Sequence, residues 1–144
     1  MPSTQSTLPI SDMPALQYDH SSPTIASLIR TVITQSHTIA HSTVPSDLLS
    51  KSSTPHSPAP SAQLPKAVFY PRSTRDTSII LKACHEHKVA ITAFSGGTSL
   101  PGALANVKGG VCVDFGEMRE VRGNEEGDLD VWVQAGVGWV ELNQ

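Results

Sequence analysis

The chain has 144 residues, a formal net charge of -3 and two cysteines. Nucleic-acid phosphates are bound by clustered Lys and Arg, and the sequence has no basic cluster, so nucleic acid is not expected as a partner. Two cysteines outside a C-x-x-C pair do not make a disulfide framework, and no apolar run approaches the roughly 20 residues of a transmembrane segment.

Composition divides the chain near Pro65. Of the first 65 residues, 31 are Ser, Thr or Pro, whereas all ten glycines lie at or after Gly96. We therefore expect residues 1–65 to be a mostly disordered tail and linker and residues 66–144 to fold. The tail is rich in hydroxyls and poor in acids, as transit peptides are, but Arg30 is its only arginine, so this targeting signal is weak.

A short helix is predicted within the tail, over residues 24–35. Apolar residues recur there at helical spacing, and Thr24 follows Pro23 in a position to cap the helix. A disordered tail with a transient helix fits the same residues. From His37 to Pro65 the sequence predicts linker, interrupted by one helical turn that starts at Ser46 or Asp47.

Alternating elements are predicted from Lys66 onward. Residues 67–70 form a short strand that ends at Pro71. Residues 73–88 form a helix capped by Ser73 or Thr74, and its buried stripe is Ile79, Ile80, Ala83 and Cys84. The nearly all-apolar residues 89–94 predict a second strand, buried on both faces. This strand, helix and strand make a βαβ unit.

Further strands are predicted at residues 110–115, around Val121 and at 129–136. In the last of these, Leu129, Val131 and Val133 alternate with polar residues or Trp, which favours one buried face. The final residues predict the beginning of a helix, and a helix that begins there suggests a domain truncated at its C-terminus. The predicted class is α+β.

The loop after the second strand contains the first candidate for chemistry. Gly96 and Gly97 permit positive φ and let backbone N–H groups point outward, as in an anion-binding nest. The hydroxyls of Ser95, Thr98 and Ser99 add donors. A phosphate or pyrophosphate is the ligand that such a loop suits.

The loop has three alternative interpretations. A P-loop needs a Lys after its glycines, which this loop lacks. A nucleophile elbow needs a helix directly after its Ser and a later His, but Pro101 and Gly102 disfavour the helix and no His follows His87. The third interpretation, a Gly-rich turn that binds no ligand, is not excluded by the sequence.

His85 and His87 lie two apart on the predicted helix and cannot share a metal, so no metal site is predicted.

Three segments in register carry a family resemblance: YPRST (70–74), FSGGTSL (94–100) and DLDVWVQAGVGWVELN (128–143). They resemble the first half of an FAD-binding domain of the p-cresol methylhydroxylase or vanillyl-alcohol oxidase type. Within it they are most similar to cytochrome-linked D-lactate dehydrogenases and glycolate oxidase flavoprotein subunits. The resemblance covers residues 66–144. The sequence differs from the family pattern at Pro101, Gly102 and Ala103, where members of the family usually have an acidic residue and then Gly-His.

The resemblance implies the first lobe of a two-lobed α+β domain that binds FAD. The cofactor-binding residues that it implies are Pro71, Ser95, Gly96, Gly97, Thr98, Ser99, Leu100 and Gly136. Trp132 and Trp139 are expected to pack rather than to stack on a flavin. The family's catalytic residues belong to a second lobe and a cap domain, so none is assigned here.

The resemblance predicts an N-terminal portion of a flavin-dependent 2-hydroxy-acid dehydrogenase, acting on a D-lactate-like substrate once the C-terminal part is supplied. The family indicates a mitochondrial location, with the cytoplasm as the alternative. The alternative function is a truncated, catalytically inactive half-domain that binds no cofactor by itself.

Overall fold

The structure is a computed structural model that describes residues 17–52, 64–98, 109–123 and 130–144. Within these ranges the chain forms four helices and four strands. In chain order they are α1 (Ser22–Gln35), β1 (Ala40–Ser42), α2 (Pro45–Ser50), β2 (Ala67–Tyr70), α3 (Thr74–Glu86), β3 (Ile91–Phe94), β4 (Val111–Asp114) and α4 (Trp139–Leu142). This mixture of helices around a mixed sheet confirms the predicted fold class.

The four strands form one sheet in the order β1-β2-β4-β3. Strand β4 pairs in parallel with both β2 and β3, so Cys112 lies opposite Val68 on one side and Thr92 on the other. Strand β1 is antiparallel to β2. The carboxyl ends of β2, β3 and β4 therefore lie along one edge of the sheet, which is where open α/β sheets bind their ligands.

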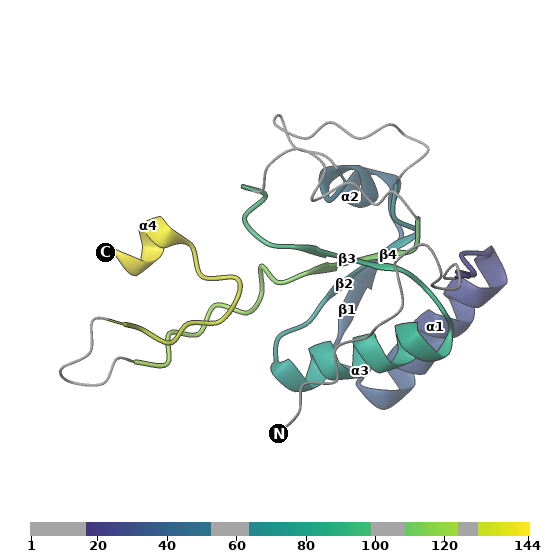
Figure 1. Cartoon of the computed structure of the whole chain (residues 1–144), viewed down its shortest axis with the longest axis horizontal. Helices are drawn as coiled ribbons and strands as arrows, with labels where there is room; N and C mark the ends of the chain where they lie inside the picture. Colours follow the sequence, from purple (N-terminus) through teal and green to yellow (C-terminus); the bar gives the residue numbers. More distant parts are fainter. Residues whose placement is uncertain (1–16, 53–63, 99–108, 124–129) are drawn as a thin grey trace, which may run out of the picture.

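Helices α1 and α3 pack together on one side of the sheet, and α2 lies on the other (Figure 1). The core lies where α1 and α3 pack against the two central strands, β2 and β4. Leu28 and Val32 of α1, Ile80 of α3, and Phe69 and Val111 of the sheet are all fully buried. Burial on both faces explains why β2 and β4 are nearly continuous apolar runs.

Helix α3 confirms the sequence prediction, including its cap and most of its buried stripe. The Ser73 hydroxyl accepts a hydrogen bond from the Asp76 N–H at 3.1 Å. Asp76 is itself buried, and its carboxylate accepts hydrogen bonds from the Arg72 N–H and the Ser36 hydroxyl. One carboxylate therefore holds the turn after β2 against the end of α1.

The described part of the N-terminal segment belongs to the fold more fully than the composition indicated. Helix α1 begins at Ser22, with Ser21 rather than Thr24 in the N-cap position, and Pro23 lies in its first turn. Strand β1 lies in a stretch that was predicted to be linker, and α2 begins at Pro45, before the predicted start. Pairing with β2, which local sequence does not reveal, makes Ala40–Ser42 a strand.

The prediction that the second strand is buried on both faces is wrong. Strand β3 starts at Ile91, and its residues are exposed or half-buried. The reason is its place in the sheet, because β4 lies between β2 and β3 and leaves β3 at the edge. Gly110, just before β4, packs closely against Ala90, just before β3. A Cβ at Gly110 would lie 2.2 Å from the Ala90 carbonyl oxygen.

Residues 116–123 and 130–144 extend away from the sheet (Figure 1). The strands predicted around Val121 and at 129–136 are reduced to one antiparallel bridge between Val121 and Val133. Val131 and Val133 are 38% and 40% exposed, so the predicted buried face is not covered by the described residues; Leu129 lies outside them. The predicted final helix is present as α4. In the described ranges, no helix has the length and apolar character to cross a membrane.

Candidate functional site

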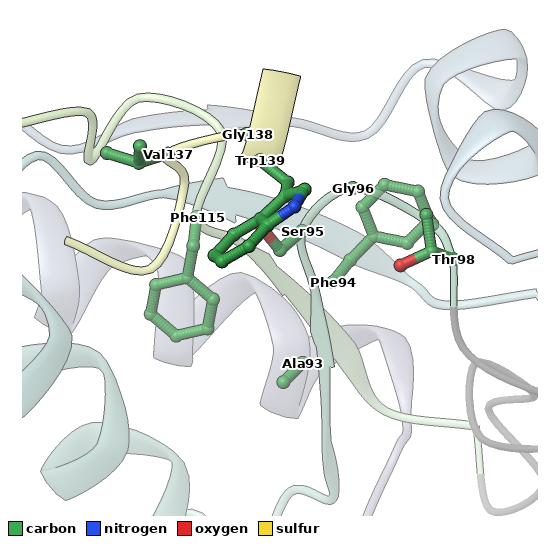
Figure 2. Close-up of a pocket in the computed structure, with 10 residues that line it drawn as sticks. Ala93, Phe94, Ser95, Gly96, Thr98, Phe115, Val137, Gly138 and Trp139 are labelled. Carbon is green, nitrogen blue, oxygen red and sulfur yellow. The ribbon is translucent and has the colours of Figure 1, made fainter. Parts of the chain in front are cut away.

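A pocket of about 440 Å³ lies at the carboxyl end of β3. Residues 93–98 form one wall, Phe115 after β4 contributes to the floor, and residues 137–139 form the opposite wall (Figure 2). Three separate parts of the chain thus converge at the edge of the sheet where the parallel strands end. Of the predicted site residues, Ser95, Gly96, Gly97 and Thr98 line this pocket.

Gly96, Gly97 and Thr98 contribute backbone to the lining of the pocket. Gly97 has φ of +68°, a conformation that favours glycine. Among the residues that the structure describes, none accepts a hydrogen bond from the backbone N–H of Gly96, Gly97 or Thr98. A Cβ at Gly96 would meet only the Thr98 Cγ2 atom, at 3.9 Å, so the space beside this backbone is open. Open space beside uncommitted N–H groups fits the phosphates of a nucleotide cofactor.

Ser95 has a different role from the one its hydroxyl suggested. Its Oγ donates a hydrogen bond to the Ala135 carbonyl oxygen at 2.7 Å. The hydroxyl proton therefore joins the loop to the turn at residues 135–138 and is not directed at a ligand. This bond sets the separation of the two walls of the pocket.

Gly136 lies behind the pocket wall. Its N–H donates to the Met118 carbonyl oxygen at 2.8 Å, and an added Cβ would lie 2.1 Å from the Phe115 carbonyl oxygen. Gly136 does not line the pocket. Glycine is required here for close backbone packing, which positions Val137 and Gly138 in the wall.

The other predicted site residues lie elsewhere. Pro71 follows β2 along the same edge of the sheet, but it is fully buried and does not line the pocket. Ser99 and Leu100 lie outside the described residues, as do Pro101, Gly102 and Ala103.

The aromatic walls of the pocket were not predicted. Phe94 and Phe115 are half-buried side chains at the ends of β3 and β4, and Trp139 begins α4. Phe115 could have been found from its position, because a residue that directly follows a parallel strand lies at the ligand-binding edge. Trp139 could not, because its approach to the loop depends on the long-range contact between Ser95 and Ala135.

A partly buried ion pair lies beside Phe94, one of the residues that line the pocket. Lys51, which follows α2, contacts the Asp114 carboxylate at 2.7 Å, and its ammonium lies 4.8 Å from the centre of the Phe94 ring. The Asp114 Oδ1 atom also accepts a hydrogen bond from the Gly116 N–H. Burial acts to lower the pKa of Lys51, but the hydrogen bond and charge of Asp114 outweigh it and raise the pKa above its ordinary value. The pair ties α2 to the ends of both strands that flank the pocket.

Together, these features define a class of protein: a mixed sheet with a glycine loop at the ends of its parallel strands, suited to a phosphate-bearing cofactor. Residues 65–144 match the family described as "FAD binding domain". The chain belongs to this family, and its cofactor is FAD.

Curated relatives agree with the family. The chain is 44% identical over 81 residues to the mitochondrial D-lactate dehydrogenase [cytochrome] of Arabidopsis thaliana, covering 56% of this chain and 14% of the relative. It is 38% identical over 74 residues to glycolate oxidase subunit GlcD of Bacillus subtilis, covering 51% of this chain and 16% of the relative. The chain thus spans about one-sixth or less of the length of these relatives.

The fold is similar to that of a solved structure, p-cresol methylhydroxylase with substrate bound. The TM-score is 0.71 at 18% identity, and the similarity covers 85% of this chain and 24% of the other. At this identity the similarity shows the fold. It extends beyond the residues matched by the family, so the described N-terminal elements include part of the shared architecture.

Proposed function

We propose that residues 66–144 form the N-terminal part of the FAD-binding domain of a flavin-dependent 2-hydroxy-acid dehydrogenase that acts on a D-lactate-like substrate. The observation that carries this proposal is the loop at residues 95–98, which lines an open pocket at the ends of parallel strands. The backbone N–H groups of residues 96–98 have no acceptor among the described residues. The substrate class comes from the relatives, which are a D-lactate dehydrogenase and a glycolate oxidase subunit.

The cofactor contacts divide into two kinds. The pyrophosphate would accept backbone hydrogen bonds from Gly96, Gly97 and Thr98. We propose the same role for Ser99 and Leu100. Ser95, Pro71 and Gly136 would act on the same site by fixing the loop and the opposing turn. The chemistry that bound FAD supplies is acceptance of a hydride from the carbon bearing the substrate hydroxyl. The residues of this chain bind and orient the cofactor for that chemistry.

A mitochondrial location is part of the proposal. It is supported by the names of the D-lactate dehydrogenase relatives from plant and yeasts, all of which are called mitochondrial. The Ser- and Thr-rich first residues, which contain few acids, are compatible with it.

The alternative is a half-domain that binds no cofactor by itself. The observation that favours it is the exposure of the second wall of the pocket, where Trp139 is 78% exposed; Val140, next to it in the chain, is 75% exposed. A pocket that is this open covers only part of a ligand as large as FAD.

The two functions are separated by titrating FAD with the 144-residue chain and following flavin fluorescence and anisotropy. Saturable binding supports the proposed function. Gly96→Val tests the loop directly, because the side chain would enter the space beside the donors while meeting only the Thr98 methyl group. We expect at least about a tenfold loss of FAD affinity with an unchanged unfolding midpoint. Absence of binding by folded wild-type chain would support the half-domain.

A further inference from the structure

Trp139 combines high exposure with a place in the cofactor pocket. It is 78% exposed, yet it lines the pocket together with Phe94 and Phe115. Figure 2 shows its indole extending from α4 toward the loop side of the pocket, between the labelled Phe115 and Phe94 rings. Indole surface is strongly apolar, so its exposure inside a binding pocket favours coverage by a ligand with an apolar face.

The backbone that carries Trp139 is held in place. Glu141 of α4 forms an ion pair with Arg119 at 2.6 Å and accepts a hydrogen bond from the Gly138 N–H. The bond from Ser95 to Ala135 joins the same segment to the loop. The segment that carries the indole therefore contacts both the loop and the residues after β4, and the bond from Ser95 joins it directly to the loop.

The pocket is divided chemically. On one wall, the loop at residues 96–98 offers backbone N–H groups, which bind anionic oxygens. Opposite it, Trp139 offers a flat aromatic face with Phe115 beside it. A single ligand that fits both walls combines anionic oxygens with a planar ring system, and the phosphates and rings of FAD meet both requirements.

We propose that Trp139 is a binding residue that stacks on a planar ring of FAD, with the indole as the aromatic wall of the pocket. This inference rests on the proposed function. Both the isoalloxazine and the adenine of FAD have the required flat face. The expectation that Trp139 packs inside the protein is thereby replaced by a role in ligand binding.

The test compares two tryptophans of similar exposure, because Trp132 is 71% exposed and does not line the pocket. Flavin anisotropy gives the FAD affinity of the 144-residue wild-type chain and of Trp139→Ala, Trp139→Phe and Trp132→Ala. We expect Trp139→Ala to weaken FAD binding about tenfold, Trp139→Phe to retain most of the affinity, and Trp132→Ala to match wild type. Unfolding midpoints should agree for all four proteins, since both indoles are exposed.

Competition by FMN and by ADP identifies the ring, since each carries one of the two planar systems. The competitor whose affinity falls in Trp139→Ala contains the stacked ring. Equal FAD affinity of wild type and Trp139→Ala would overturn the inference and leave the proposed function standing. Absence of FAD binding by every protein, wild type included, would overturn both.

Discussion

The Ser95 hydroxyl and the Ala135 carbonyl oxygen, 40 residues apart in the chain, lie 2.7 Å apart and join the two walls of the proposed cofactor pocket. The bond connects a loop that offers backbone donors to a turn that precedes an exposed tryptophan. Because the loop follows an edge strand and the turn lies in a segment that extends from the sheet, neither is positioned by the core alone. The pocket therefore depends on this contact for its width.

Removing this contact should weaken cofactor binding. Ser95→Ala deletes one side-chain-to-backbone hydrogen bond, which contributes about 1 kcal/mol, and we expect about a fivefold loss of FAD affinity. Ser50→Ala is the matched control, because the Ser50 hydroxyl donates to the Asp47 carbonyl oxygen at 2.8 Å in α2. FAD titration of both variants measures the difference. Equal affinities would show that the Ser95 bond does not set the pocket.

Gly136 and Gly138 should respond differently to the same added methyl group. A Cβ at Gly136 would overlap the Phe115 and Met118 carbonyl oxygens, whereas a Cβ at Gly138 has nothing within 4 Å. We expect Gly136→Ala to destabilise the protein by about 2 kcal/mol through overpacking, and Gly138→Ala to change stability by less than about 1 kcal/mol. Urea unfolding measures both values. Similar values for the two variants would contradict the close packing of residues 115–118 against Gly136.

The ion pair of Lys51 and Asp114 should contribute to stability through the burial of Asp114. Lys51→Met leaves a carboxylate whose side chain is 5% exposed without its cation, and we expect a loss of about 2 kcal/mol. Arg72→Met is the control, because its pair with Glu117 is 3.5 Å long and more than half exposed on both sides, and such pairs contribute about 0.5 kcal/mol or less. Adding Asp114→Asn to Lys51→Met should recover part of the loss. A double variant as unstable as the single one would exclude the uncompensated charge as the cause.

The same pair predicts a dependence on alkaline pH. Asp114 raises the pKa of Lys51 above its ordinary value of 10.5, against the opposing effect of burial. The contribution of the lysine charge is therefore fully present below pH 10.5 and is lost as pH rises through the higher folded pKa. Urea unfolding of wild type and Lys51→Met across this range should show the two stabilities converging as pH rises. Parallel curves would contradict the assignment.

The two thiols should be unreactive in the folded protein. Burial raises the pKa values of Cys84 and Cys112 to about 12 from an ordinary value of 9.0. Since the unfolded chain releases these protons first, the thiols lower stability as pH rises from 9.0 toward 12. At neutral pH we expect labelling by a thiol reagent to be about 100-fold slower than in denaturant, where both cysteines react. Rapid labelling of either cysteine without denaturant would show that its part of the core opens readily.

Features that depend on neighbouring residues could be predicted from the sequence, and features that depend on strand order could not. Helix α3 and its Ser73 cap were predicted because a cap and a buried stripe are local patterns. The position of strand β3 in the sequence was predicted, but its burial was not. Its burial depends on the pairing of β4 between β2 and β3, which the local sequence of β3 does not reveal. At the site, the glycines of the loop are local signals. The aromatic wall has no such local signal, because Trp139 lies near the loop through the long-range hydrogen bond between Ser95 and Ala135.

The position of β4 between β2 and β3 also governs how the chain can reach its folded state. Strands β2 and β3 precede β4 in sequence but share no ladder with each other, since each pairs in parallel with β4. During synthesis, an emerging chain can form α3 and the antiparallel pair of β1 and β2, but it cannot join β3 to the sheet until residues 111–114 are available. Such long-range parallel pairing is slow because loop closure precedes its stabilisation. Assembly of the cofactor edge is therefore a late event in folding.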